Sequence, residues 1–144
     1  MSNGPKLSAD DKLEIMELLS RYNVAVGEGL PDDVAACFTE DGYVNGKNGL
    51  SVGHAALRRI GLLATPERKL RHIISNTLIR PRTGEPDVAD VRSHLLYYEV
   101  TPAGIDFKAS GIYTDVVVKT EGGWKFRSRV MTPALGGAWP GQKL

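Results

Sequence analysis

Helical and strand patterns occupy separate parts of this 144-residue chain. Apolar residues recur at helical spacing up to about residue 64, and from residue 70 onward the chain is rich in Val, Ile, Leu, Tyr and Phe. Segregation of this kind is typical of α+β folds, whereas alternation would indicate βαβ units. The sequence therefore predicts one α+β domain, with all strands after residue 41 and a cavity between the first helix and the sheet.

Three helices are predicted before the main sheet. The first follows Ser8, whose spacing from Asp11 is that of a capping pair, and it stops at Gly27. The second begins at Pro31, a residue suited to the first helical turn, and ends at the sequence TEDG. The third covers roughly residues 54 to 64, where apolar residues return every three positions.

Four long strands follow the helices. The breaks between them read RTGEP, TPAG and EGG, which are turn sequences. Three consecutive hairpins predict an antiparallel and strongly curved sheet, and a further short strand is expected around Tyr43. The four strands are predicted over residues 70–80, 88–100, 105–119 and 123–131.

Alternation along two of these strands predicts which face is buried. Trp124 and Phe126 alternate with a basic set that ends in Arg129, so the basic set is expected at the surface or at an interface. In the strand over 88–100, the less charged set that includes Tyr97 is expected to face inward. A β-bulge would exchange the two faces midway.

Composition excludes several classes of function. With 18 basic and 17 acidic residues the net charge is +1, which argues against a nucleic-acid or membrane partner. The single Cys37 allows no intramolecular disulfide, and no His/Cys pair has zinc-site spacing. The polar start lacks the apolar segment of a signal peptide. We expect a soluble, cytoplasmic protein without metal or cofactor that binds a neutral or weakly charged small molecule.

Four stretches, in their order and spacing, resemble the SnoaL-like branch of the nuclear transport factor 2-like superfamily: LLSRYNVAVGEG, AACFTEDGYVNG, LRHIISNTLI and GIYTDVVVKTEGGWKFRSRV. The resemblance covers residues 8–132, which leaves 1–7 and 133–144 as predicted tails. It implies a cone-shaped barrel of three N-terminal helices packed on a curved, mainly antiparallel sheet around one apolar cavity. It also implies homodimers or trimers that pack sheet to sheet. Relatives include scytalone dehydratase, polyketide cyclases and non-catalytic dioxygenase β subunits.

The lyases of this group resemble one another in a histidine that is supported by an aspartate five residues after a helical aromatic. By that pattern His72 matches the histidine, Tyr22 matches the aromatic and the aspartate position falls on Gly27. The adjacent Glu28, one methylene longer, is the candidate substitute for orienting the imidazole. Tyr22 either donates a hydrogen bond to a substrate oxygen or is a core aromatic.

Other candidates follow from their place on the strands. His72 is either a general base or a strand histidine bonded to a neighbour. Asn76, two pleats beyond it, either lines the same cavity or bonds backbone at a strand bend. Tyr97 and Tyr113 are expected in the cavity wall as ligand contacts. Asp115 shares the face of Tyr113 and is expected in a structural hydrogen bond or in an ion pair with an arginine.

Two functions remain open at this point. In the first, the protein is a cofactor-free lyase, isomerase or cyclase, in which His72 removes a proton from a small hydrophobic or polycyclic substrate and neutral donors stabilise the oxyanion. In the second, it is a non-catalytic small-molecule-binding or subunit-type domain, which the missing aspartate at Gly27 favours. A module that binds proteins through its outer sheet face is a third reading, and the polar character of that face argues for weak association.

Overall fold

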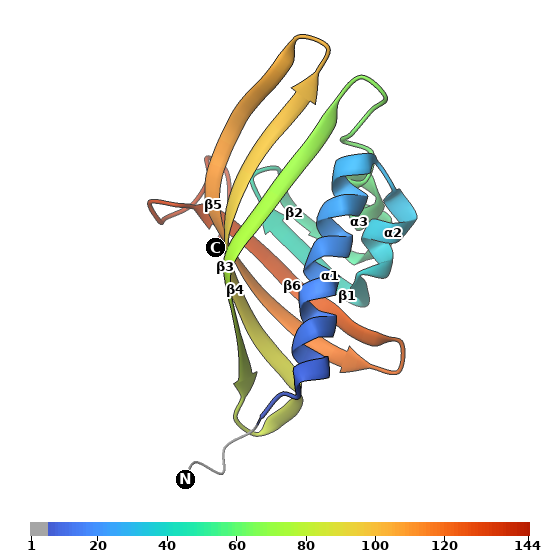
Figure 1. Ribbon diagram of the computed structural model, residues 1–144, viewed down its shortest axis with the longest axis vertical. Coiled ribbons are helices and arrows are strands. Elements are labelled where there is room, and N and C mark those ends of the chain that lie inside the picture. The colour runs from blue at the N-terminus through green and yellow to red at the C-terminus, as the bar shows by residue number, and fades with distance from the viewer. Residues whose placement is uncertain (1–5) are drawn as a thin grey trace.

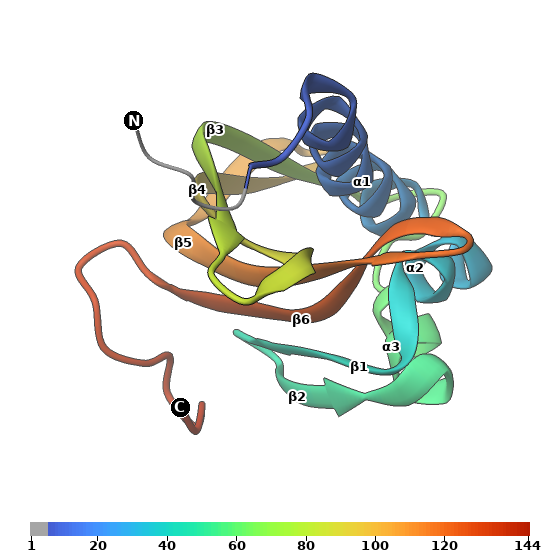
Figure 2. The ribbon, with the colours of Figure 1, turned by 90° about the horizontal axis from the view of Figure 1, so that it is seen from below.

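The computed structural model describes residues 6–144 and confirms the α+β architecture (Figure 1). Three helices lie on one side of a six-stranded sheet, as the perpendicular view also shows (Figure 2). The helices are α1 (Ala9–Glu28), α2 (Pro31–Ala36) and α3 (Gly53–Ile60). The strands are β1 (Phe38–Gly46), β2 (Gly49–Val52), β3 (Lys69–Arg82), β4 (Glu85–Thr101), β5 (Gly104–Thr120) and β6 (Gly123–Pro133).

The sheet is open, so the predicted barrel is wrong. Its strand order is β2-β1-β6-β5-β4-β3, which leaves β2 and β3 as the two edges. The hairpins from β3 to β6 are antiparallel as predicted, but β1 pairs with β6 in parallel. β2 has only four residues and leads directly into α3, so it offers no partner that could close the sheet onto β3.

The first strand begins earlier than residue 41. Phe38 is buried and pairs with Phe126 of β6, and the sequence TEDG that follows belongs to β1 rather than to the end of α2. Between Phe38 and Tyr43 the pairing register with β6 shifts, so these polar residues bulge out of the ladder. Helix α3 likewise ends at Ile60, before the predicted residue 64, and the chain turns there.

Alternation predicted the faces of β4 correctly and those of β6 only in part. Tyr97 faces inward, opposite His72 of β3. Trp124 and Phe126 are buried as expected, but Arg129 is buried completely, which overturns its predicted surface position. The cause is a bulge: Val116 pairs with Ser128 and Val117 with Phe126, so one extra residue reverses the inward set beyond it.

Helix α1 anchors the core and is capped as predicted. The Ser8 hydroxyl accepts a hydrogen bond from the Asp11 amide at 2.9 Å, and the Asp11 carboxylate bonds back to Ser8. Asp11 also accepts from the Trp124 indole at 3.0 Å, which ties the start of α1 to β6. The apolar face of the helix packs on the sheet through Ile15, Leu18, Leu19, Tyr22, Ala25 and Val26. None of the helices in residues 6–144 has the length and apolarity of a membrane span.

Some apolar side chains on the sheet remain exposed. Ile73 and Leu96 face each other across β3 and β4, and each is about half exposed, at 48% and 49%. They alternate with His72 and Tyr97, which line the cavity, so they lie on the outer face. Self-association through this face, as a homodimer or trimer, stays a prediction.

Helix α1 comes very close to the sheet at Gly27. A Cβ atom at this position would lie 2.4 Å from the Leu70 carbonyl oxygen of β3. Real carbon and oxygen atoms do not approach so closely without strain, so any side chain here would push the helix away from the strand. Gly27 therefore sets the distance between α1 and β3.

Replacing Gly27 by alanine is expected to lower the free energy of unfolding by about 1–3 kcal/mol, the usual cost of overpacking. At an unobstructed helix position the same change would raise it by about 1 kcal/mol, because alanine is the better helix former. Chemical denaturation measures the difference. The matched control is Gly122→Ala, whose new Cβ would meet its nearest neighbour at 3.5 Å. A Gly27→Ala variant as stable as the wild type would contradict the close approach.

Candidate active site

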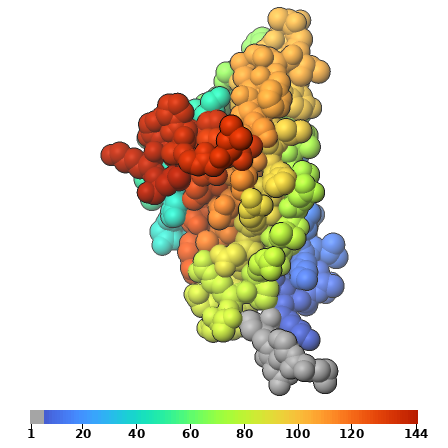
Figure 3. All heavy atoms as spheres, turned by 90° about the vertical axis from the view of Figure 1, so that its left-hand side faces the viewer, coloured from blue at the N-terminus to red at the C-terminus, as the bar shows by residue number. Residues whose placement is uncertain are grey.

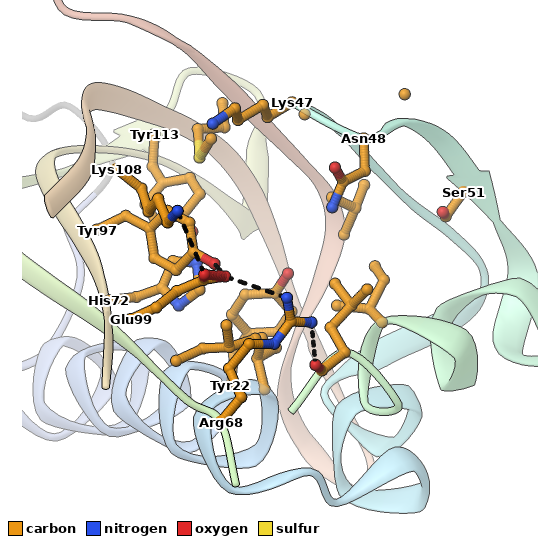
Figure 4. Close-up of a pocket in the computed structure, with 18 residues that line it drawn as sticks. Tyr22, Lys47, Asn48, Ser51, Arg68, His72, Tyr97, Glu99, Lys108 and Tyr113 are labelled. Atoms are coloured by element: carbon orange, nitrogen blue, oxygen red, sulfur yellow. Dashed lines mark hydrogen bonds and ion pairs between the residues drawn. The ribbon is translucent and has the colours of Figure 1, made fainter. Parts of the chain in front are cut away.

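A cavity of about 380 Å³ lies between α1, the loop after α3 and the inner face of the sheet (Figure 4). This volume is in the range of pockets that hold small organic ligands. Much of its wall is aliphatic and comes from helix, loop and strands. The aliphatic lining residues are Val26, Val44, Ile60, Leu63, Leu70 and Met131.

His72 lies in the wall of this cavity, as the sequence predicted. Its ring stacks on that of Tyr97, with centroids 4.5 Å apart and planes inclined by 15°. Its Nδ1 atom is buried and has no hydrogen-bond partner among the described residues. Burial, helped by the positive charge of Arg129, lowers the pKa of His72 to about 4. The imidazole is therefore neutral at physiological pH and able to accept a proton.

Glu28, predicted as a substrate-binding residue that orients His72, lies outside the cavity lining. Its carboxylate forms ion pairs with Arg71 at 2.9 Å and with Lys69 at 3.4 Å on the outside of the helix. The reason is helical geometry, since successive residues are rotated by about 100°. Glu28 therefore meets Lys69 and Arg71, which alternate along β3 with the cavity-lining Leu70 and His72.

Asn76 also lies outside the cavity. Its backbone has a positive φ of 53° at the point where the β3–β4 register shifts, so the predicted alternation from His72 ends before it. The exposed side-chain amide donates a hydrogen bond to Nδ1 of His94 at 3.1 Å. Of the two alternatives for Asn76, the structure therefore agrees with a position at a strand irregularity. Its hydrogen-bond partner, however, is a side chain and not the predicted backbone group.

The three predicted tyrosines all line the cavity. Burial raises the pKa of Tyr22, and the neighbouring Tyr113 raises that pKa further. Burial also raises the pKa of Tyr113, to about 12. Both hydroxyls are therefore protonated and able to donate a hydrogen bond at physiological pH. The Tyr97 hydroxyl differs, because it already donates to the Glu99 carboxylate at 2.9 Å.

Beneath these tyrosines lies a buried ion pair between β5 and β6. Arg129 donates two hydrogen bonds to Asp115, at 2.9 and 3.0 Å, and both side chains are inaccessible to solvent. The guanidinium carbon lies 4.8 Å from the ring centre of Tyr22 and 3.7 Å from that of Tyr113. Burial opposes the charge on Arg129, but Asp115 and the two tyrosines together raise the arginine pKa, while burial raises the pKa of the Asp115 carboxyl. The two short bonds to one carboxylate are the geometry of an ionised pair. The predicted ion pair of Asp115 with an arginine is confirmed.

Sequence reasoning missed a group of charged residues in the cavity wall. Glu99 lies between Arg68 and Lys108, at 3.4 and 3.8 Å (Figure 4). Glu99 could have been found, because it follows Tyr97 by two residues and shares its face of β4. Lys108 could not, because it is the unpaired residue of a bulge in β5, which alternation does not predict.

The C-terminal segment packs against the β1–β2 end of the molecule (Figure 3). The Trp139 indole and the Gln142 amide both donate to the Met131 carbonyl, at 3.0 and 2.8 Å. Asn45 of β1 donates to the Lys143 carbonyl at 2.7 Å. Since Met131 also lines the cavity, this segment braces one of its walls from outside. Within residues 6–144, no three His, Cys, Asp or Glu side chains converge as a metal site would require.

Comparison with known proteins gives one family match and many structural matches. A family model described as SnoaL-like domain matches residues 8–130. No curated protein matches the chain. Among solved structures, a protein of unknown function from Mycobacterium tuberculosis is 30% identical, with a TM-score of 0.75 over 85% of this chain and 70% of that one.

Two similar structures come from Novosphingobium aromaticivorans. A candidate aromatic ring hydroxylase is 26% identical, with a TM-score of 0.77 over 91% of this chain and 94% of that one. A candidate scytalone dehydratase is 28% identical, with a TM-score of 0.68 over 87% of each chain.

Replacing Asp115 by asparagine is expected to lower the free energy of unfolding by about 3–5 kcal/mol, because it leaves the buried Arg129 charge uncompensated. Urea denaturation measures the loss. Asp90→Asn is the matched control: Asp90 also accepts two bonds from an arginine, Arg82, at 2.8 and 3.0 Å, but its side chain is 48% exposed. There we expect a loss of about 1 kcal/mol or less. Equal losses in both variants would contradict the importance of the buried pair.

The His72 imidazole is expected to titrate near pH 4, below its ordinary value of 6.5. The unfolded chain protonates His72 more readily than the folded protein does. His72 therefore leaves the free energy of unfolding unchanged above pH 6.5 and lowers it as the pH falls from 6.5 towards 4. NMR titration of the ring measures the midpoint, and His72→Gln should flatten that part of the stability curve. A midpoint near 6.5 would show that the ring is solvated.

Proposed function

Because the chain belongs to the SnoaL-like domain family, we propose that it is a cofactor-free lyase, isomerase or cyclase. Its substrate would be a small hydrophobic or polycyclic molecule bound in the cavity. The observation that carries the proposal is a neutral imidazole beside the aliphatic part of a cavity that also holds two tyrosine hydroxyls. The 28% identical candidate scytalone dehydratase supports the same class of reaction.

In the proposed reaction His72 takes a proton from a carbon next to a carbonyl group. The electron pair of the broken C–H bond forms an enolate, and the negative charge collects on its oxygen. Tyr22 and Tyr113 would donate hydrogen bonds to that oxygen. The Arg129 charge beneath both rings acts against the effect of burial on their pKa, so it makes each hydroxyl a better donor. In an isomerisation the imidazolium then returns the proton to another carbon of the conjugated enolate. In an elimination the enolate electron pair forms a C=C bond as the bond to the leaving group breaks, and the imidazolium protonates the departing group.

The environment of His72 restricts which substrates can react. A base whose pKa is about 4 removes a proton less readily than an ordinary histidine. No carboxylate from residues 6–144 is bonded to its ring to stabilise the imidazolium. The substrate should therefore carry an already acidic C–H bond, as in a ketone whose α carbon is also bonded to an aromatic ring. The enolate formed beside the imidazolium would itself supply the stabilising negative charge.

A second candidate function is ligand binding without chemistry, in a binding protein or subunit-type domain. The specific observation in its favour is Gly27, where the close approach to Leu70 leaves no room for the aspartate of the lyase pattern. An imidazole without an orienting partner serves as well for packing against a ligand as for proton transfer. The two functions use the same cavity and differ only in whether His72 exchanges a proton.

Deuterium exchange into 2-tetralone tests the choice, because the carbon between the carbonyl and the aromatic ring of this bicyclic ketone carries acidic protons. We expect the wild-type protein in D₂O to accelerate exchange, followed by NMR, and His72→Gln to slow it by about 10²–10⁴-fold. His94→Gln, on the exposed outer face, is the matched control. Tetralone binding without faster exchange would favour the ligand-binding function, and exchange that survives in His72→Gln would refute His72 as the base.

A further inference from the structure

The cavity wall has more positive than negative side chains. Lys47, Arg68 and Lys108 line it together with one carboxylate, that of Glu99 (Figure 4). The pKa of His72 keeps its ring neutral at pH 7. Asp106 contacts Lys108 at 2.6 Å but does not line the cavity. The three cations and the two carboxylates, those of Glu99 and Asp106, together carry a net charge of +1. One monoanionic group on a ligand would neutralise this charge.

Glu99 is a distant partner for the cavity cations, and the short ion pair of Lys108 is the one with Asp106, outside the cavity lining. Charge-assisted N–H···O bonds are usually about 2.7–2.9 Å long, whereas Arg68 and Lys108 stand 3.4 and 3.8 Å from Glu99. The short bond of Glu99 is the one that it accepts from Tyr97 at 2.9 Å. Among the residues the structure describes, Lys47 has no ion-pair partner, and its ammonium lies 5.9 Å from the Trp139 ring.

Backbone features hold two of these cations in place before any ligand binds. The Arg68 guanidinium donates to the Leu63 carbonyl, which fixes it over the cavity (Figure 4). Lys108 is the extra residue of the β5 bulge, which aims it at the cavity instead of along the regular alternation. Their side chains are 41% and 34% exposed, and Lys47 is exposed, so all three can meet a ligand that enters from solvent.

We propose that the molecule bound in this cavity carries a carboxylate besides its apolar ring system. The carboxylate binds among Lys47, Arg68 and Lys108, while the rings occupy the aliphatic part beside His72. The guanidinium fork of Arg68 matches the two oxygens of a carboxylate. This inference rests on the proposed function for the location of the substrate, and it narrows the substrate class to aromatic or alicyclic acids.

Calorimetric titration with 2-naphthoate and its neutral analogue 2-naphthamide tests the proposal. We expect the wild-type protein to bind 2-naphthoate at least about tenfold more tightly at low salt, with a preference that declines as salt is added. Lys47→Gln and Arg68→Gln should each reduce this preference several-fold and leave naphthamide binding unchanged. Lys12→Gln, which removes the same charge from the exposed side of α1, should retain the full preference.

Several outcomes would overturn the inference. These are equal affinities for the acid and the amide in the wild type, a preference that survives in both cavity variants, and no measurable binding of 2-naphthoate. Lys47→Gln keeps the test decisive if Arg68→Gln fails to fold. His72→Gln should retain the preference for the acid even though it loses exchange activity, so failure of the catalytic proposal and failure of this one give different results.

Discussion

The ion pair between Arg129 and Asp115 is the interaction on which the rest of the site depends. Removing one partner of a buried pair leaves an uncompensated charge, so the elements that hold this pair must keep their relative positions. Arg129 comes from β6 and Asp115 from β5, and Tyr22 of α1 stacks on the same guanidinium. The pair therefore joins helix and sheet at the floor of the cavity. It also places a fixed positive charge close enough to lower the pKa of His72.

The sequence predicted regular structure well and failed where regularity stops. Turn sequences located the hairpins, and strict alternation placed Tyr97 inward beside His72. Three register shifts then moved charged or polar side chains to faces that alternation does not predict: Arg129 became buried, Lys108 turned into the cavity and Asn76 left it. A bulge depends on how two distant strands pair, and no local pattern in either strand records it.

The family resemblance located the cavity and misjudged the surroundings of the histidine. Spacing alone brought His72 and Tyr22 correctly to the cavity wall. Spacing could not show that α1 approaches β3 so closely that only glycine fits at Gly27, because this distance is a property of the packed helix and sheet. In place of the aspartate of the lyase pattern, the carboxylate beside Tyr97 is that of Glu99, from the far end of β4. The Tyr97 ring is the one that stacks on His72.

The open sheet has a consequence for the solubility of the chain. An exposed edge strand can pair with another molecule and start aggregation, and β3 is such an edge, with the apolar run HIISNTLI in its middle. The left-handed backbone of Asn76 interrupts that run, and Pro81 removes a backbone donor near its end. The start of β3 packs against the end of α1, where Leu70 meets Gly27 and Lys69 pairs with Glu28. The irregularity that took Asn76 out of the cavity thus also makes this edge a poor template for adding a strand from a neighbouring molecule.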